Sequence, residues 1–414
     1  MTDSRDDAAW AAAQDAADPL ARLRGEFLLP SGADGEPLLY FAGHSLGLQP
    51  RRARELIDRE LLNWARLGVE GHFAGQSPWM PYHELLTAST ARLVGALPHE
   101  VVVMNTLSVN LHLLMVSFYR PAGKRNRILI EAGAFPSDQY AVASQVRFHG
   151  LDPRETVLEA LGGAEILRLI EEQGDSIALV LLGNVNYLSG EAFDIAAITR
   201  AGHARGCLVG FDLAHGAGNL ELNLHDDGPD FAAWCSYKYL NAGPGACGGA
   251  FVHERHAKAE LPRFAGWWGH DKATRFQMGS DFKPIRGAEG WQLSNPPILP
   301  LAALRASMEL FDAVGMRALR AKSVRLTGYL EYLLDQLPGG RFELVTPRDP
   351  NRRGNMLTLR ILGDAKALVA SLQASGALCD FRAPDIVRLA PAPLYTRFAD
   401  VRRLIGLLRA AWHG

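Results

Sequence analysis

Short apolar runs alternate with amphipathic stretches through the middle of the chain. Runs rich in β-branched side chains predict five strands, at residues 101–104, 127–130, 177–182, 208–212 and 231–237. Between these runs, apolar residues recur at helical spacing, which predicts helices that connect successive strands. This alternation predicts an α/β fold with a mostly parallel sheet covered by helices, and such a sheet binds ligands at the carboxyl ends of its strands.

The segments around this region have other patterns. Helical spacing of apolar residues predicts helices at 51–66 and 81–97 before it, and two long amphipathic helices at 299–314 and 317–337 after it. Residues 262–290 are rich in glycine and aromatic residues, which indicates an irregular wall of a pocket rather than a linker.

The C-terminal part of the chain predicts a small α/β unit of its own. Strands are expected at 356–361 and 386–389, and helices at 364–375 and 399–412. We therefore expect three parts: an N-terminal segment that packs with the small domain, a large domain, and a smaller C-terminal domain, at residues 1–50, 51–300 and 301–414 respectively.

Bulk composition narrows the class of protein. The chain has 414 residues, of which 48% are hydrophobic, so it can bury a full-sized core. Its net charge of −2 and the absence of a dense Lys/Arg stretch argue against a nucleic acid partner. No apolar run approaches the roughly 20 residues of a membrane span, and the N-terminus lacks the apolar segment of a signal peptide. The four cysteines have no C-x-x-C spacing, so we expect neither a metal site nor a disulfide framework, and a cytoplasmic protein.

One lysine, Lys238, stands within an apolar and aromatic stretch, residues 230–245. A lysine there either extends to solvent or is desolvated and becomes a nucleophile toward carbonyl groups. Asp212 ends the preceding predicted strand, and His215 follows it by one short turn. An acid, a later lysine and an aromatic loop before both fit a pyridoxal phosphate site, where the lysine forms a Schiff base and the acid pairs with the pyridinium nitrogen. On this stretch alone, a surface lysine remains the alternative.

Other candidate residues stand where predicted elements end. Phe135 and Asp138 follow the second strand, and Thr106 or Ser108 begins the helix after the first. Free backbone N–H groups at such a helix start bind anions, although a plain helix cap explains the same residues. Two glycines in the loop at residues 43–50 let the backbone approach another group closely, or simply form a turn.

Taken together, five motifs resemble those of the kynureninases, a family of pyridoxal phosphate enzymes with the aminotransferase-like fold, type I. They lie at residues 104–112, 135–138, 210–215, 235–241 and 294–297, and the likeness runs from about Tyr40 to the C-terminus. Two positions depart from the family pattern. His44 replaces an asparagine in the early loop, and Gly183 replaces a small hydroxyl residue that the family often has beside the cofactor.

The resemblance implies a role for each site residue. Lys238, Tyr237 and Asp212 are the implied catalytic residues. The implied contacts of pyridoxal 5'-phosphate are Leu107, Ser108, Phe135, Pro136, Ser137, Asp138, Gly183, Asp212, His215, Tyr237, Lys238, Trp267 and Asn295. Trp267 and Asn295 are expected to come from the second subunit of a homodimer with shared active sites. The implied substrate contacts are Arg388, which would clamp the α-carboxylate, and Ser45, His72 and Asn295.

The implied reaction is hydrolysis of L-kynurenine, or its 3-hydroxy form, to anthranilate, or 3-hydroxyanthranilate, and L-alanine. Tyr237 is either an acid/base in this reaction or only a phosphate ligand. His72 and Asn295 are polar residues that could hydrogen-bond a ring hydroxyl, which favours 3-hydroxykynurenine.

Two alternatives compete with this interpretation. A cysteine desulfurase-like lyase of the same fold would have a histidine before the lysine and a catalytic cysteine in a mobile loop, whereas Tyr237 precedes Lys238 here. A non-catalytic protein that binds pyridoxal phosphate is disfavoured because Lys238, Asp212 and Arg388 are all present.

Overall fold

A seven-stranded sheet forms the centre of the larger part of the molecule. The computed structural model describes residues 4–413. The strand order is β4-β10-β9-β8-β7-β5-β6, and β10 runs antiparallel to both of its neighbours. Strands β6, β5, β7, β8 and β9 are mutually parallel, which confirms the predicted mostly parallel sheet. The bounds are β4 (Val101–Val103), β5 (Arg127–Glu131), β6 (Val157–Ala160), β7 (Ile177–Gly183), β8 (Leu208–Asp212), β9 (Phe231–Trp234) and β10 (Gly249–Val252).

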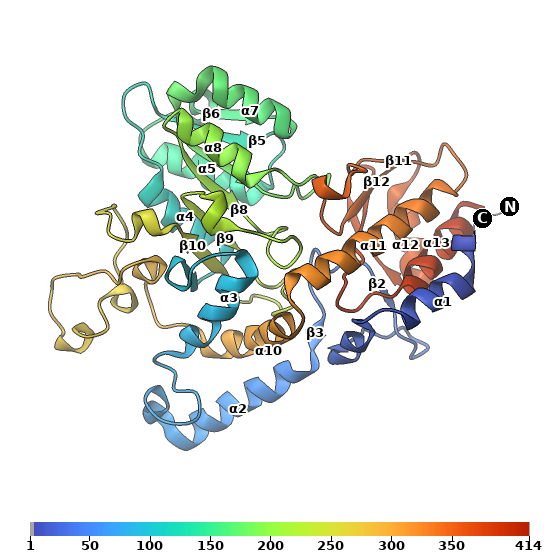
Figure 1. Ribbon diagram of the computed structural model, residues 1–414, viewed down its shortest axis with the longest axis horizontal. Coiled ribbons are helices and arrows are strands. Elements are labelled where there is room, and N and C mark those ends of the chain that lie inside the picture. Colours follow the sequence, from blue (N-terminus) through green and yellow to red (C-terminus); the bar gives the residue numbers. More distant parts are fainter. Residues whose placement is uncertain (1–3, 414) are drawn as a thin grey trace.

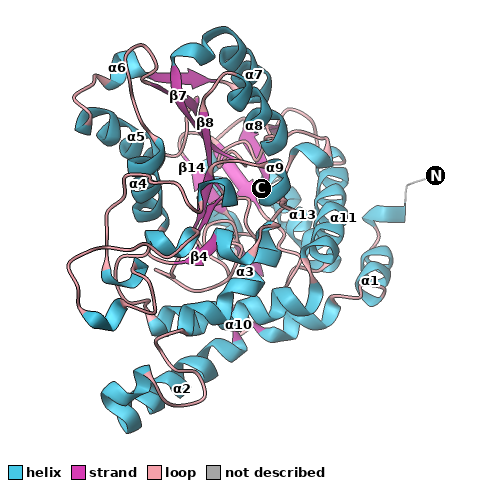
Figure 2. Ribbon diagram, turned by 60° about the vertical axis from the view of Figure 1, so that its left-hand side comes forward, coloured by secondary structure: helices cyan, strands magenta, loops and turns pink. Residues whose placement is uncertain are grey.

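Helices pack on both faces of this sheet, and the strands lie inside them (Figure 2). Along β9, Phe231 and Ala233 belong to one hydrophobic core, whereas Ala232 and Trp234 belong to the other, as expected for side chains that alternate across a sheet. The first core also contains α4 (Leu107–Phe118) and α5 (Pro136–Phe148). The second contains residues of α2 (Arg51–Leu67), α3 (Thr87–Val94), α7 (Gly162–Gln173), α8 (Ile195–Ala204) and α10 (Ile298–Val314).

Gly210 on β8 shows how closely this sheet is packed. A Cβ at that position would lie 2.2 Å from the ring of Phe231 on β9, so the aromatic side chain occupies the space that another residue would need. Phe231 is itself fully buried. The sequence analysis did not predict β6, α7 or β10, and it extended β9 three residues beyond its end at Trp234.

A four-stranded antiparallel sheet forms the smaller part, and Figure 1 shows it beside α11, away from the large sheet. Its order is β11-β12-β15-β14, with bounds β11 (Phe342–Leu344), β12 (Leu357–Ile361), β14 (Asp380–Arg382) and β15 (Ile386–Leu389). Its hydrophobic core includes residues of α1 (Ala8–Ala16), α11 (Met316–Asp335), α12 (Ala365–Ala374) and α13 (Phe398–His413).

The N-terminal segment packs on this smaller part. Helix α1 contacts α13, and β2 (Leu39–Tyr40) pairs in parallel with β13 (Ala377–Leu378). Helix α10, which spans residue 300, instead packs on α2 with the larger part. The three-part division at residues 50 and 300 stays a prediction. Among the described residues, no helix combines the length and the apolar character needed to cross a bilayer.

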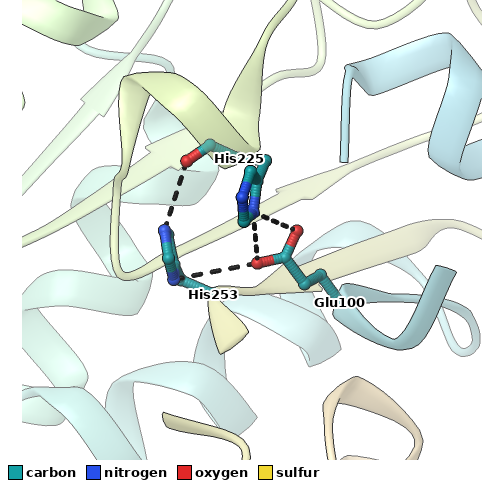
Figure 3. A group of neighbouring side chains, drawn as sticks. All are labelled: Glu100, His225 and His253. Atoms are coloured by element: carbon teal, nitrogen blue, oxygen red, sulfur yellow. Dashed lines mark hydrogen bonds and ion pairs between the residues drawn. The ribbon is translucent and has the colours of Figure 1, made fainter. Parts of the chain in front are cut away.

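Three side chains on separate segments form a buried hydrogen-bonded brace beside β4 (Figure 3). Glu100 is fully buried and accepts the backbone N–H groups of Leu97 and Glu254, each at 2.8 Å. Nδ1 of His225 lies 3.1 Å from both carboxylate oxygens of Glu100. His253 accepts the backbone N–H of Arg255 at Nδ1 and lies 3.2 Å from the carbonyl oxygen of His225 through Nε2. Hydrogen bonds and the ion pair between His225 and Glu100 therefore hold the brace together.

The brace predicts a pH-dependent contribution to stability. The hydrogen bond to Glu100 raises the pKa of His225, so protonated His225 stabilises the fold fully below its unfolded pKa of about 6.5, and this is lost as the pH rises through the folded pKa. Since the His225 side chain is 31% exposed, the contribution should stay below about 1 kcal/mol. We expect His225→Gln to lower the melting temperature more at about pH 5.5 than at about pH 8.5.

The matched control is His99→Gln, because His99 is a more exposed histidine that is also paired with a glutamate. Its melting temperature should follow that of the unaltered protein at both pH values. An equal loss for His225→Gln at both pH values would show that His225 contributes by packing and not by its charge.

Candidate active site

One pocket lies at the carboxyl ends of β5, β7, β8 and β9 and at the N-termini of α4 and α5. It is lined by Thr106, Leu107, Ser108, Glu131, Phe135, Ser137, Asp138, Gly183, Val185, Tyr187, Asp212, Ala214, His215, Tyr237 and Lys238. Parallel strands present their carboxyl ends at one edge of a sheet, so residues far apart in the chain meet there. This is the edge at which the sequence pattern placed the candidate residues.

The pocket brings together most of the residues expected to contact the cofactor. Those that line it are Leu107, Ser108, Phe135, Ser137, Asp138, Gly183, Asp212, His215, Tyr237 and Lys238. Pro136 is the first residue of α5, between two of these, and is not itself in the lining.

The turn that carries Lys238 is built by backbone contacts and not by the sheet. After β9 ends at Trp234, the N–H of Asn241 donates to the carbonyl of Lys238 at 3.1 Å, and Asn241 has a left-handed φ of 52°. The N–H of Gly47 in the early loop donates to the carbonyl of Tyr237 at 2.8 Å. A Cβ at Gly47 would lie 2.3 Å from the carbonyl oxygen of Lys238, so this close approach requires glycine.

The amine of Lys238 faces into the pocket. Its Nζ lies 3.2 Å from Nε2 of His215, and Nδ1 of His215 lies 3.3 Å from the hydroxyl oxygen of Tyr239. Burial, together with the charge of Lys238, lowers the pKa of His215 well below its usual value, so the imidazole is neutral and accepts a hydrogen bond from the amine. The ring centroid of Phe135 lies 5.8 Å from Nζ. The alternative of a surface lysine is therefore wrong.

Two carboxyl groups, buried Asp212 and partly buried Asp138, share a hydrogen bond on the floor of the pocket. Asp212 ends β8, and its Oδ1 accepts the backbone N–H of Ala214 at 2.7 Å. Burial, and next the charge of Asp212, raise the pKa of Asp138 well above its usual range, so Asp138 holds the proton of the pair. Asp212 is then free to act as the carboxylate that faces a cationic group.

The helix starts at the other side of the pocket form an anion cradle. The Oγ atoms of Ser108 on α4 and Ser137 on α5 lie 2.8 Å apart. Asn110 fixes the start of α4, because its Nδ2 donates to the carbonyl of Met104 at 2.9 Å and its Oδ1 accepts from Asn105 at 3.1 Å. In α5, Pro136 has no N–H and the N–H of Asp138 donates to the carbonyl of Phe135 at 2.9 Å, so the N–H of Ser137 is the one left at that helix start. The first N–H groups of α4 and the positive ends of both helix dipoles add to the cradle.

Arg388 on β15 reaches the border of the pocket from the smaller part. Its side chain is 2% exposed, and its Nη1 donates to the carbonyl of the pocket residue Tyr187 at 2.6 Å. Its Nη2 pairs with Asp380, the residue directly across from it on β14. Among the described residues, Nε of Arg388 has no hydrogen-bond partner. The guanidinium has five N–H donors, so these two contacts leave donors for a further ligand.

His44, which replaces the usual asparagine, belongs to the same network. Its Nε2 lies 3.4 Å from Oδ2 of Asp380. Burial lowers the pKa of His44 to about 4, so the ring is neutral at physiological pH. Burial alone would raise the pKa of Asp380, but His44 and Arg388 hold it below its usual range. Ser45 follows in this loop, is exposed, and does not line the pocket.

Three other expected contacts lie away from this pocket. Trp267 is 39% exposed, and its Nε1 donates to the carbonyl of Arg275 at 3.1 Å. Asn295 is exposed, and His72 packs with its ring 5.4 Å from that of Trp79. None of the three lines the pocket of this chain. The roles of all three stay predictions, and those of Trp267 and Asn295 depend on a second subunit.

Four pocket residues were not among the residues expected at the site: Glu131, Val185, Tyr187 and Ala214. Glu131 ends β5 in the same way that Asp212 ends β8, so the rule that ligands bind at strand ends could have found it. Tyr187 lies in a turn after β7, without a periodic pattern that would single it out.

The donor set of this pocket fits pyridoxal phosphate. It offers an amine at Lys238, a buried acid at Asp212, the aromatic ring of Phe135 and a cradle of two helix N-termini for a phosphate. These are the groups that such a cofactor uses for attachment, ring protonation, stacking and phosphate binding.

Comparison with known proteins decides the family. The chain is 65% identical to a kynureninase from Myxococcus xanthus over 97% of both chains, and 59% identical to one from Koribacter versatilis over 96% of both. The chain belongs to the kynureninase family. Residues 319–408 also match the model of the kynureninase C-terminal domain. The family expected from the motifs is thereby confirmed.

Among solved structures, a cysteine desulfurase from Escherichia coli matches with a TM-score of 0.76 and 17% identity, over 95% of this chain and 98% of the other. A structure titled as a C-DES mutant with glycine covalently linked to the PLP cofactor matches with a TM-score of 0.75 and 18% identity, over 90% and 96%. At this identity the likeness shows the fold alone. The cysteines do not favour a desulfurase, since Cys207, Cys235 and Cys247 are buried and Cys379 is partly buried.

Proposed function

We propose that this kynureninase-family enzyme uses pyridoxal phosphate to hydrolyse the Cβ–Cγ bond of L-kynurenine or 3-hydroxykynurenine. The products are L-alanine and anthranilate or 3-hydroxyanthranilate, with the oxygen of water entering the new aromatic carboxylate and a proton entering Cβ. The observation that carries the proposal is the grouping of Lys238, Asp212 and the two helix starts in one pocket of a chain 65% identical to a kynureninase. When bound there, the cofactor supplies an electron sink for carbanions of the substrate.

Lys238 and Asp212 perform the central proton steps in this proposal. Nζ of Lys238 attaches the cofactor and, once released, takes the proton from Cα of the substrate. Neutral His215 accepts a hydrogen bond from this amine and keeps it directed into the pocket. The carboxylate of Asp212 would hold a proton on the ring nitrogen of the bound cofactor, and Phe135, which also lines the pocket, would pack on the ring.

Tyr237 is the proposed proton donor late in the reaction. Burial raises the pKa of its phenol, so the hydroxyl keeps its proton at physiological pH and can give it to Cβ. The same protonated hydroxyl could donate a hydrogen bond to the phosphate, which is the second role expected from the resemblance. We further propose a cytoplasmic place in tryptophan catabolism, on the kynurenine route toward NAD.

Release of anthranilate fluorescence from kynurenine tests the proposed function directly. The protein loaded with pyridoxal phosphate should release it, and a second assay with 3-hydroxykynurenine gives the ratio of kcat/KM for the two substrates. We propose that the hydroxylated substrate is preferred, and that His72→Phe shifts the ratio toward kynurenine. Sulfur release from cysteine without kynurenine cleavage would instead support the desulfurase alternative.

Arg388→Lys should weaken substrate binding more than turnover. Lysine has a single ammonium group in place of the planar guanidinium, so it cannot keep the contacts with both Asp380 and the carbonyl of Tyr187. Loss of a charge-assisted hydrogen bond costs about 1.5–3 kcal/mol, so KM for kynurenine should rise about 10- to 100-fold. We expect kcat to change by less than about threefold. Steady-state kinetics measure both constants.

Arg360→Lys is the matched control, because Arg360 lies on the neighbouring strand β12 in exposed ion pairs with Glu343 and Asp385. It should leave KM unchanged. An unchanged KM in Arg388→Lys would place the carboxylate clamp at another residue.

We also propose a homodimer in which Trp267 and Asn295 complete the site of the other subunit. Support comes from three exposed aromatic side chains on the larger part, Phe73, Trp267 and Phe276, whose rings lie against one another. Light scattering should give twice the mass of the 45.1 kDa chain. A fully active monomer would contradict the shared site.

Subunit exchange tests the sharing itself. Lys238→Ala and Trp267→Ala each impair every site of their own homodimer. In a mixed dimer, one of the two sites has both an intact lysine and an intact tryptophan. Random exchange makes about half of the dimers mixed, so about a quarter of the activity should return. No recovery on mixing would mean that Trp267 serves its own subunit.

A further inference from the structure

Glu131 is a buried carboxyl group that the mechanism above does not use. It is the last residue of β5, is 4% exposed and lines the pocket. Among the described residues, its Oε2 has no hydrogen-bond partner. Burial raises the pKa of Glu131 to about 8, so the side chain is a neutral acid with a proton to donate at physiological pH.

Gly183 has no side chain to fill the space between Glu131 and the floor of the pocket. Strands β5, β7 and β8 are neighbours, and they end at Glu131, Gly183 and Asp212 respectively. Gly183 pairs directly with Asp212 in the sheet, and a Cβ at Gly183 would lie 3.3 Å from Oε1 of Glu131. The φ of Gly183 lies outside the left-handed region, so the backbone does not require glycine there.

The groups around Glu131 favour its uncharged form. Asp212 on β8 and Glu191 in the segment after β7 both act on it with negative charge, and Glu131 in turn acts on Asp138 of α5. The hydrogen bond with Asn186 is the opposing influence. A charged Glu131 would add another buried negative charge beside the Asp138 and Asp212 pair, which is costly without a cationic partner.

We propose that Glu131 is a positioning residue of this site, which donates a hydrogen bond through the gap at Gly183 to the phenolic oxygen of the bound cofactor, because the ring nitrogen beside Asp212 carries a proton and cannot accept. The inference rests on the proposed function, since it places pyridoxal phosphate in this pocket. Glu131, the third carboxyl group of the pocket, is then an uncharged hydrogen-bond donor, whereas Asp212 is a carboxylate.

Titration of the apoenzyme with pyridoxal phosphate, followed by absorbance, tests the donor. Glu131→Leu removes the donor and should weaken cofactor binding at least tenfold. Glu131→Gln keeps an N–H donor of similar shape and should stay within threefold of the unaltered enzyme. The matched control Glu191→Gln removes a nearby acid that lies outside the pocket lining, so its affinity should be unchanged.

Two results would overturn the inference while the unaltered enzyme binds the cofactor normally. Glu131→Leu could bind as tightly as the unaltered enzyme, or Glu131→Gln could be as weak as Glu131→Leu, which would mean that a charge is needed. Failure of the unaltered apoenzyme itself to bind pyridoxal phosphate would instead overturn the proposed function, and the inference with it.

Thermal unfolding of the apoenzyme gives a readout that needs no cofactor. Because the folded-state pKa of Glu131 is raised, the folded chain holds a proton that the unfolded chain releases, and stability falls as the pH rises toward about 8. Glu131→Gln has no such proton, so its melting temperature should fall less between pH 6 and pH 9. Asp138 titrates in both proteins, and loss of the Glu131 charge that acts on it makes the fall in the variant smaller still. Parallel curves for the two proteins would contradict an uncharged Glu131.

Discussion

Replacing Lys238 with alanine is expected to abolish kynurenine cleavage, with kcat lowered by at least about a thousandfold. One atom, Nζ, is both the proposed attachment point of the cofactor and the proposed carrier of the Cα proton, so no partial function survives its loss. The amine is held 3.2 Å from Nε2 of His215, and no other lysine lines the pocket. The fold should persist, because the surrounding turn is held by backbone hydrogen bonds.

Three measurements check this result: kcat with kynurenine, the absorbance band of lysine-bound cofactor, and the melting temperature. The band should vanish while the melting temperature stays near that of the unaltered apoenzyme. Lys366→Ala, on the exposed face of α12 in the smaller part, is the matched control and should retain full activity. Turnover near that of the unaltered enzyme in Lys238→Ala would refute the mechanism.

Replacing Asp212 with alanine is expected to lower kcat by about 100- to 1,000-fold without loss of the fold. Without a carboxylate beside it, the ring nitrogen loses its proton and the cofactor becomes a poor electron sink. Asp212→Asn removes the charge but keeps the shape of the side chain, and the amide oxygen can still accept the backbone N–H of Ala214. We therefore expect the asparagine variant to be nearly as slow as the alanine variant.

The apoenzymes of both variants should be at least as stable as the unaltered one at about pH 8, since burial raises the pKa of Asp212 and its ionised form is costly to bury. Comparison of kcat with melting temperature across the two variants checks this pattern. If Asp212→Asn kept normal kinetics, the partner of the ring nitrogen would be a different group, and Asp138 would be the next to test.

The sequence by itself determined five of the seven strands of the main sheet and much of the pocket. Apolar runs have the period of the strands that they form, and parallel strands deliver their carboxyl ends to one edge. For this reason Phe135, Asp138, Asp212 and His215, which stand at or soon after the end of a predicted strand, could be placed together before any contact was known. The pattern also gave the helix start at Ser108, the family motifs added Tyr237, and both residues line the pocket.

Only the tertiary structure decided the contacts between distant segments, because the hydrophobic pattern of one segment does not predict which other segment packs against it. Arg388 donates to Tyr187 at 2.6 Å although 201 residues separate them, and His44 approaches Asp380 from the other end of the chain. These pairs exist because the small sheet and the early loop pack against the large sheet, and periodicity within one segment carries no information about that packing. The sequence shows that Glu131 ends a strand. That its carboxyl group lies beside Gly183 depends on which strands are neighbours in the sheet. Its protonation follows from burial, which is a property of the folded chain.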